Sequence, residues 1–317
     1  MDWNVKRIAL LFALGLFGLS GCNMTAPRQT PPPAPRPAKP AKPTAAPQSA
    51  ASQQMAQHLA RLQADLRVQG LLRTDGGGPD VPFYQRDLVN NFIRIAMFDE
   101  YTANNGSIVA RQTESKLRRW EQPIRMKIEF GASVPLEQRS QDTRYIRDYI
   151  KRLAKLTGLS IRLSDYKPNY HVLILNEDER QAVGPRLRQL APGISGASER
   201  TITQMAPSTM CLVFAYSQGE NSSAYAKAVA VIRGEHPDLL RHSCIHEELA
   251  QGLGLANDSP QARPSIFNDD EEFGLLTYHD GLLLKILYDK RLQTGMTALK
   301  ARPIVTQIAA ELMGASI

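Results

Sequence analysis

Residues 246–258 read HEELAQGLGLAND and combine carboxylate and amide side chains in an order that suits metal binding and hydrolysis. Glu247 and Gln251 are four residues apart, so on a helix they project from the same face, with Glu248 one position around. Gly254 would end the helix and turn the chain back. The polar residues on the returning chain are Asn257 and Asp258. A helix face, a glycine turn and a returning polar residue are typical of a metal site with a catalytic carboxylate.

The ligand types in this stretch are unusual for zinc. In the common H-E-x-x-H pattern two histidines bind the zinc ion and the glutamate acts as a base, whereas the histidine positions here hold Glu247 and Gln251. With Asn257 or Asp258 they form an all-oxygen set, which suits Ca²⁺, Mg²⁺ or Mn²⁺ better than Zn²⁺. Glu248 would then be the base for a metal-bound water. In the alternative no cofactor binds, and these side chains hydrogen-bond within a retained scaffold.

Two histidines on the same predicted helix leave a second metal site open. His242 and His246 are four residues apart and could bind a metal ion as a pair. No third ligand is evident beside them, and the alternative is that each is a satisfied or partly exposed helix histidine. A zinc motif that starts at His246 would need a second histidine at position 250, which is Ala250. Of the metal sites that this stretch offers, we therefore favour the carboxylate set over the histidine pair.

An ordered series of helices and strands must position these residues. Alternating or continuous apolar runs predict strands at 123–130, 161–163, 170–175, 210–216 and 225–232, the last two antiparallel. Helical spacing predicts helices at 85–101, from an Asp142 cap to Gly158, at 179–190 with a break near Gly184, from Pro237 onward, and from a Thr277 cap with Asp280. A turn is predicted at 104–106. The order of these elements predicts an α/β layered domain with a mixed sheet, a site helix and a C-terminal helix, preceded by N-terminal helices.

The N-terminus has the pattern of an export signal. Two basic residues precede an apolar run at 8–19 that is too short to span a bilayer. The small residues before Cys22 resemble the bacterial lipobox, which implies a signal peptide over residues 1–21 and a lipidated Cys22 with palmitate among its acyl chains. An ordinary secretory signal with an incidental cysteine is the alternative. Asn23 in place of aspartate favours the outer membrane, with the protein anchored in the envelope and facing the periplasm.

A Pro- and Ala-rich tether follows the lipidated cysteine over residues 22–50. Its composition cannot bury a core, so we expect an extended spacer with a reach of about 80–90 Å. Residues 51–73 have the apolar spacing of a helix that either forms a short coiled coil, by which the chain would oligomerise as an envelope spacer, or packs on the domain. The glycine-rich stretch 74–80 marks the boundary of a globular domain over residues 74–317.

The positive charge of the chain belongs to its N-terminal part. The signal carries +1, residues 23–50 carry +4 and residues 51–73 carry +2 of the total of +7, which leaves residues 74–317 neutral. A neutral domain lacks the electrostatic footprint of a nucleic-acid-binding protein. We therefore expect no nucleic acid as partner.

Two cysteines remain after Cys22. Cys211 and Cys244 lie in the predicted exported domain, where thiols are oxidised, so they predict one disulfide. Two buried thiols are the alternative.

The site stretch resembles the zinc motif of the metzincins, H-E-x-x-H-x-x-G-L-x-H-D. The matching residues are Glu248, Gly254, Leu255 and Asp258, and the three ligand positions hold Glu247, Gln251 and Asn257. Residues 264–268 are similar to the metzincin Met-turn, with Phe267 at the methionine position, and residues 276–288 resemble the last helix of the matrixin branch. Asp269 falls where some metzincins place a further ligand, although an acidic run is more often a solvated loop. The resemblance covers about residues 123–292 and implies a metzincin-like fold.

The whole chain also resembles an uncharacterised family of bacterial lipoproteins that carries this altered motif, and that resemblance implies no known activity. We predict a periplasm-facing lipoprotein, not an enzyme, that has lost the zinc-ligand histidines and binds a peptide, a protein or an envelope polymer such as peptidoglycan. The alternative is a divalent-metal-dependent hydrolase in which Glu248 is the base.

Overall fold

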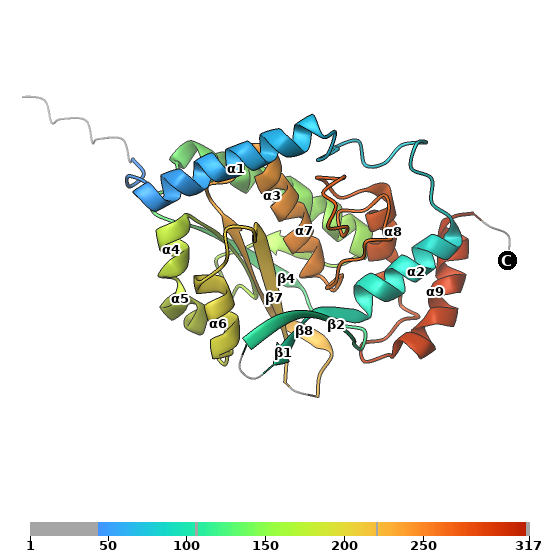
Figure 1. Ribbon diagram of the computed structural model, residues 1–317. Helices are drawn as coiled ribbons and strands as arrows, with labels where there is room; N and C mark the ends of the chain where they lie inside the picture. The colour runs from blue at the N-terminus through green and yellow to red at the C-terminus, as the bar shows by residue number, and fades with distance from the viewer. Residues whose placement is uncertain (1–43, 105–106, 220, 315–317) are drawn as a thin grey trace, which may run out of the picture. The chain divides into compact units, whose positions relative to one another are not determined.

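The computed structural model describes residues 44–104, 107–219 and 221–314 (Figure 1). The predicted signal peptide, Cys22, the tether up to residue 43 and the predicted turn at 104–106, apart from Asn104, lie outside the described residues. Within the described part of the chain, no helix combines the length and the apolar character needed to span a bilayer.

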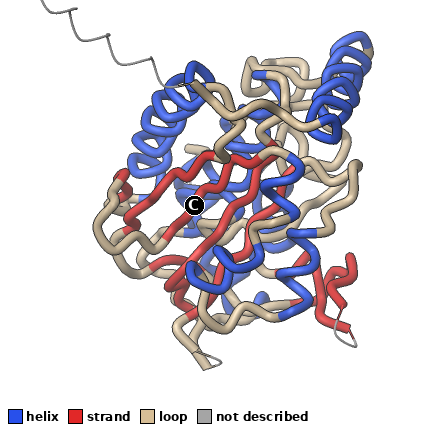
Figure 2. Tube along the Cα trace, turned by 90° about the vertical axis from the view of Figure 1, so that its left-hand side faces the viewer, coloured by secondary structure: helices blue, strands red, loops and turns tan. Residues whose placement is uncertain are grey.

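A six-stranded mixed sheet forms the centre of the fold (Figure 2). Its strands are β3 (Arg119–Trp120), β4 (Ile124–Phe130), β5 (Ile161–Leu163), β6 (Tyr170–Leu175), β7 (Cys211–Ser217) and β8 (Ala224–Arg233). Strands β5, β4, β6 and β8 lie side by side in this order and are parallel. Strand β8 also pairs with β3, in parallel, and with β7, which is antiparallel. The strands predicted at 161–163 and 170–175 and the antiparallel pair are confirmed.

Helices cover both faces of this sheet (Figure 1). The helices of the described residues are α1 (Ala50–Val68), α2 (Gln85–Ala96), α3 (Leu136–Thr157), α4 (Glu177–Gln181), α5 (Gly184–Leu190), α6 (Gly196–Thr203), α7 (Asp238–Gln251), α8 (Tyr278–Leu287) and α9 (Ala298–Leu312). Val172 and Ile174 of β6 point into the larger core with α3, α7 and α8, whereas Leu173 and Leu175 point into a smaller core with α5 and α6. Strands buried on both faces read as continuous apolar runs, as β6 does. The predicted α/β layered class is confirmed.

The N-terminal half of the domain corrects two predictions. Helix α2 ends at Ala96 instead of residue 101, because the following residues form β1 (Phe98–Asn104), which pairs antiparallel with β2 (Ser107–Glu114). Helix α3 begins at Leu136, so Asp142 is not its cap. Asp142 is fully buried and forms an ion pair with Arg241 at 2.8 Å. The sequence showed a capping residue, but a partner 99 positions away determines its role.

Helix α1 packs on the domain, which is one of the two arrangements that the sequence left open. It ends at Val68, before residue 73, and Leu59 is fully buried. The Gln63 side-chain oxygen accepts a hydrogen bond from the Leu240 amide at the start of α7 at 3.1 Å. The chain after α1 pairs with residues 271–273 instead of marking a boundary. The described residues from 44 to 314 therefore belong to one compact unit.

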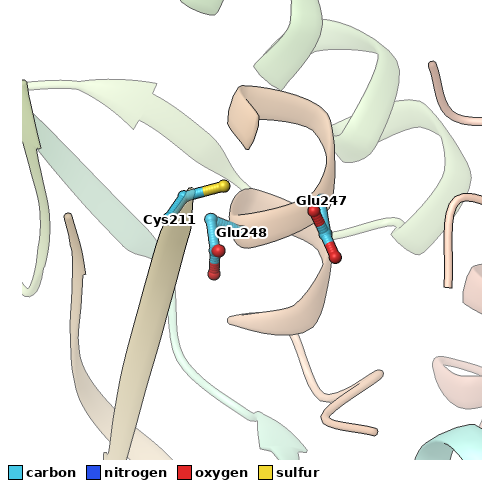
Figure 3. Close-up of side chains that lie close together, drawn as sticks. All are labelled: Cys211, Glu247 and Glu248. Carbon is cyan, nitrogen blue, oxygen red and sulfur yellow. The ribbon is translucent and has the colours of Figure 1, made fainter. Parts of the chain in front are cut away.

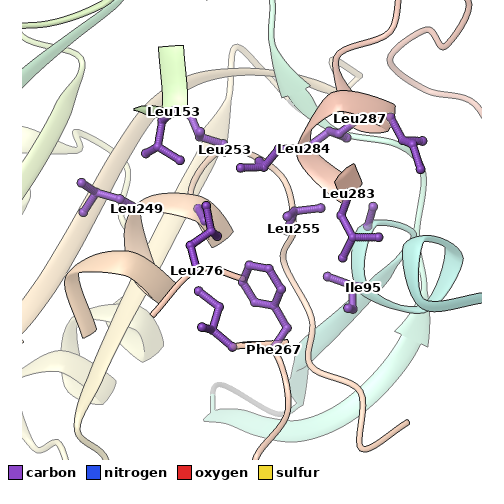
Figure 4. Close-up of a cluster of buried hydrophobic side chains, with 14 of the residues drawn as sticks. Ile95, Leu153, Leu249, Leu253, Leu255, Phe267, Leu276, Leu283, Leu284 and Leu287 are labelled. Atoms are coloured by element: carbon purple, nitrogen blue, oxygen red, sulfur yellow. The ribbon is translucent and has the colours of Figure 1, made fainter. Parts of the chain in front are cut away.

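A buried apolar cluster packs the turn at residues 264–268 against the site helix α7 (Figure 4). Phe267, at the position that the resemblance assigns to methionine, is fully buried and belongs to the same core as Leu249 and Leu283. The Asp280 carboxylate accepts hydrogen bonds from the Ser265 hydroxyl and from the Ile266 and Thr277 amides. Together with the bond from the Asp280 amide to Thr277 Oγ1, this is the predicted cap of α8, and it also fixes the turn.

Candidate binding cleft

Helix α7 carries the residues of the candidate site and is fixed at its C-terminal end by two aromatic side chains. The Tyr170 hydroxyl donates to the Glu248 carbonyl at 2.8 Å, and the Trp120 indole N–H donates to the Gly252 carbonyl at 2.8 Å. The Trp120 bond gives a partner to a carbonyl group at the helix end, and the Glu248 carbonyl accepts the tyrosine bond in addition to one from the Gly252 amide. Gly254 then adopts φ +124°, in contact range of the Arg118 carbonyl, and directs the chain back.

The returning chain brings two of the predicted ligand residues together. The Gln251 side-chain amide donates to Asp258 Oδ1 at 3.2 Å, and both residues are less than a tenth exposed. Gln112 of β2 donates to the Asp258 carbonyl at 3.1 Å, so the β1–β2 hairpin is tied to the same place. Because the Gln251 amide nitrogen faces the carboxylate, this pair is already engaged within the protein.

Asn257 lies apart from the other predicted ligands. Its side-chain amide donates to the Arg94 carbonyl at 2.8 Å, and its backbone amide donates to the Ile95 carbonyl at 3.1 Å. The residue is fully buried against α2 and does not line the cleft described below. Asn257 therefore fixes the turn to α2, as a capping side chain would.

Two carboxylates of α7 and a sulfur atom of β7 lie close together (Figure 3). One carboxylate oxygen each of Glu247 and Glu248 and the Cys211 sulfur lie within 4.8 Å of one another. Cys211 on β7 and Cys244 on α7 form a disulfide with a Cα–Cα distance of 5.8 Å, which confirms the predicted bridge. A disulfide sulfur is not a thiolate, and the thiolate is the metal ligand. In the oxidised protein the group is therefore two carboxylates beside a disulfide.

A cleft of about 570 Å³ opens between β7, α6 and the C-terminal half of α7. The carboxylate residues that line it are Asp99, Glu247, Glu248, Asp258, Asp269 and Glu271. Arg118 is the only positively charged residue among the described lining residues, and it forms an ion pair with Asp99. The opposite wall is the strand β7, with residues 211–215. The cleft is therefore acidic on one side and bounded by a sheet edge on the other.

Glu271 is a carboxylate of the cleft whose protonation is shifted toward neutral pH. Its burial, followed by the charges of Asp269 and Asp270, raises the pKa of the Glu271 carboxyl to about 7. The predicted ligand position Asp269 itself is exposed at the rim. The negative charge of the cleft therefore depends on pH close to neutrality.

The two histidines of α7 are engaged with α3. The Leu276 amide donates to His246 Nδ1 at 2.9 Å, which leaves His246 Nε2 as the donor to the Tyr145 hydroxyl at 2.9 Å. His246 stacks on Tyr149 and His242 stacks on Tyr145, with ring centroids 3.8 and 3.6 Å apart. Desolvation lowers the pKa of His246 to about 3. These contacts agree with the satisfied-histidine alternative.

Sequence reasoning missed several residues of the cleft. Asp99 and Arg118 come from segments far from α7 along the chain, and no local pattern marks them, whereas Glu271 belongs to an acidic run. The one available signal was the acidic run at 269–272, which the sequence placed just after the site turn.

Residues 85–307 match the model of a family described as "Protein of unknown function (DUF2927)". No match to the chain is found among curated proteins or among solved structures.

Proposed function

The chain belongs to this family of unknown function, and we propose that its cleft binds an extended, positively charged segment of a peptide or protein. The observation that carries the proposal is that a sheet edge and six carboxylate residues line the same cleft. The sheet edge is suited to the backbone of a partner, and the carboxylates are suited to its side chains.

Strand β7 supplies the edge. Among the described strands it pairs only with β8, so its other side presents backbone N–H and C=O groups at the cleft. An extended peptide can add to such an edge as a further strand, with main-chain hydrogen bonds giving affinity and side-chain pockets giving specificity. The 570 Å³ of the cleft provide room beside this edge.

The charge of the cleft selects the partner. With one arginine engaged by Asp99, the remaining carboxylates give the cleft a negative potential. Complementary charge speeds association and suppresses wrong partners, since like charges placed together cost several kcal/mol. A segment with alternating lysine or arginine residues matches both the edge and the carboxylates.

The zinc ion that the metzincin resemblance implies does not fit the residues at its ligand positions. Zinc sites use histidine, cysteine or carboxylate ligands that converge on one point. Here the Gln251 amide nitrogen faces Asp258, and Asn257 is turned away to the backbone of α2. This geometry favours binding over zinc-dependent hydrolysis.

The location of the protein in the cell is part of the same proposal. The lipobox-like sequence before Cys22 supports a lipid anchor in the outer membrane, and the Pro-rich tether supports a domain that reaches into the periplasm. The partner is then a periplasmic protein or peptide, including the peptides of peptidoglycan.

The test uses the full chain in detergent and two labelled peptides, one alternating lysine with threonine and one alternating glutamate with threonine. We expect the lysine peptide to bind at least about tenfold more tightly and to weaken with added salt. Glu247→Lys should abolish this preference. Glu137→Lys, an exposed position on α3, is the matched control and should bind like the parent.

A change in the peptide tests whether it adds to the sheet as a strand. Methylation of alternate amide nitrogens removes the donors that a new strand would offer to β7, so the methylated lysine peptide should lose most of its affinity. Equal binding of the lysine and glutamate peptides would refute the charge argument. Unchanged binding of the methylated peptide would refute strand addition.

A divalent-metal-dependent hydrolase remains the second candidate, because the Glu247 and Glu248 carboxylates approach each other beside the cleft and Glu248 is only 3% exposed. In that function Glu248 is the base and Glu247, Gln251 and Asp258 are the ligands. Cleavage of a peptide library by the parent chain and its loss in Glu248→Gln would support this candidate. Absence of cleavage by the parent would remove it.

A further inference from the structure

The disulfide joins the two walls of the cleft and has polar neighbours on both sides. The Cys211 sulfur lies within 4.8 Å of the Glu247 and Glu248 carboxylates, and Cys211 lines the cleft. Cys244 is 1% exposed, and its sulfur lies 3.7 Å from His236 Nε2. One sulfur is therefore open to reagents in the cleft and the other is enclosed.

We propose that reduction of this disulfide creates a zinc site whose ligands are Cys211, Cys244, Glu247 and Glu248. This site is distinct from the ligand positions of the metzincin resemblance, because two thiolates supply half of it. It also goes beyond the peptide-binding function, and neither depends on the other.

The reduction needs a protein or small-molecule dithiol as co-reactant. A thiolate of the dithiol attacks the Cys211 sulfur, the S–S bond breaks, and Cys244 leaves as a thiolate beside the His236 N–H group. The second thiol of the dithiol then attacks the mixed disulfide and releases Cys211. The two electrons and the two thiol protons of the dithiol end on the two cysteines, and the dithiol becomes a disulfide. When zinc binds, the two cysteine protons pass to solvent.

The backbone keeps the four side chains together after reduction. Cys211 stays in the β7–β8 ladder opposite Ile232, and Cys244 and both glutamates stay on one stretch of α7. Tetrahedral zinc with ligands at 2.0–2.3 Å places them roughly 3.3–3.8 Å apart. The ligand atoms of Cys211, Glu247 and Glu248 already lie within 4.8 Å of one another, and the Cys244 sulfur, which is bonded to Cys211 in the oxidised protein, must turn toward them.

Charge gives the reduced site its preference for a cation. Two thiolates beside two carboxylates repel one another in a partly buried place, so without a cation the thiols stay protonated. A divalent ion removes that repulsion, and thiolate ligands select zinc over the hard ions calcium and magnesium. The oxidised protein lacks both thiolates and should not hold zinc.

The experiment measures zinc in the full chain in detergent, with Cys22→Ser so that Cys211 and Cys244 are the only cysteines that remain. After dialysis against zinc, we expect about one zinc per chain in protein reduced with a phosphine, and almost none in oxidised protein. Cobalt in place of zinc should give the near-ultraviolet absorption of sulfur-to-cobalt charge transfer. Glu247→Gln and Glu248→Gln should each weaken zinc binding by at least about tenfold. Glu137→Gln is the matched control.

Equal zinc in the oxidised and reduced protein, no zinc in the reduced protein, a cobalt spectrum without the sulfur band, or glutamine variants that bind like the control would overturn the proposal. Circular dichroism follows the fold throughout. If reduction unfolds the chain, zinc must restore the folded signal in the reduced parent and not in Cys211→Ser. Failure to restore it in the parent would also overturn the proposal.

Discussion

Gly254→Ala tests whether the turn after the site helix is fixed by the close approach of the backbone. Gly254 has φ +124°, a conformation that L side chains rarely adopt. An added Cβ would overlap the Arg118 carbonyl oxygen and lie 3.1 Å from Leu287 Cδ2. The carbonyl belongs to backbone, so it cannot move aside as a flexible side chain would. The substitution must therefore displace either the turn or the segment before β3.

The expected loss of stability has three parts. The unfavourable φ costs about 2 kcal/mol and relief of the overlap costs about 2 kcal/mol. The reduced freedom of alanine in the unfolded chain returns about 0.7 kcal/mol. The net decrease in the free energy of unfolding is about 3 kcal/mol.

Gly158→Ala is the matched control. Gly158 has φ +73° at the end of α3, and an added Cβ would meet nothing within 4 Å. Gly158→Ala has the cost of the left-handed conformation without the overlap, so the free energy of unfolding should decrease by about 1 kcal/mol. Urea unfolding of the full chain, followed by circular dichroism, measures both variants. Equal losses would refute the argument that the Arg118 carbonyl fixes the turn. We also expect Gly254→Ala alone to weaken binding of the lysine peptide, because Arg118 and Asp258 flank the cleft.

Three further predictions concern the disulfide, an acidic residue of the cleft and the cap of α8. Cys211→Ser combined with Cys244→Ser releases a loop with a sequence separation of 33 residues, so urea unfolding should show a loss of about 3–4 kcal/mol; a loss below about 1 kcal/mol would contradict the loop-closure argument. Burial raises the pKa of the Glu271 carboxyl from 4.5 to about 7, so its contribution to stability is present below pH 4.5 and is lost as pH rises to about 7. Glu271→Gln should remove this part of the dependence of the urea midpoint on pH. An unchanged pH profile in the variant would count against the raised pKa. Asp280→Asn replaces an acceptor of three hydrogen bonds, including that from Ser265, and should lower the free energy of unfolding by about 2–4 kcal/mol in the same assay; a loss within error of zero would show that the turn does not depend on the carboxylate.

Local patterns in the sequence predicted the centre of the fold well. Strand β6 has six residues, of which five are apolar or aromatic and the sixth is His171, and burial on both faces of a sheet requires such a run. The cap of α8 was predictable because Thr277 and Asp280 interact within one helical turn. Gly158 ends α3 for an equally local reason, its left-handed conformation.

Features that depend on distant partners were not predictable. The sequence extended α2 by five residues because Met97 continues its apolar spacing, whereas pairing with β2 converts that segment into a strand. Asp142 is a residue type that commonly caps helices, but its ion pair with Arg241 determines where its side chain lies. Spacing alone placed Asn257 at a ligand position, and only the packing of α2 shows that its side chain faces another way. The acidity of the cleft arises from segments more than a hundred residues apart, which a neutral composition conceals.

The docking of α1 has a mechanical consequence. The chain enters the domain through a hydrogen bond from the Ala46 amide to the Ala132 carbonyl and continues into a helix of 19 residues whose Gln63 caps the site helix. A pulling force on the N-terminal segment therefore acts first on this bond and then on α1, before it reaches α7. Unravelling 19 helical residues to an extended chain adds about 35 Å of length. Under such a force α1 would lengthen while the walls of the cleft stay linked by their disulfide.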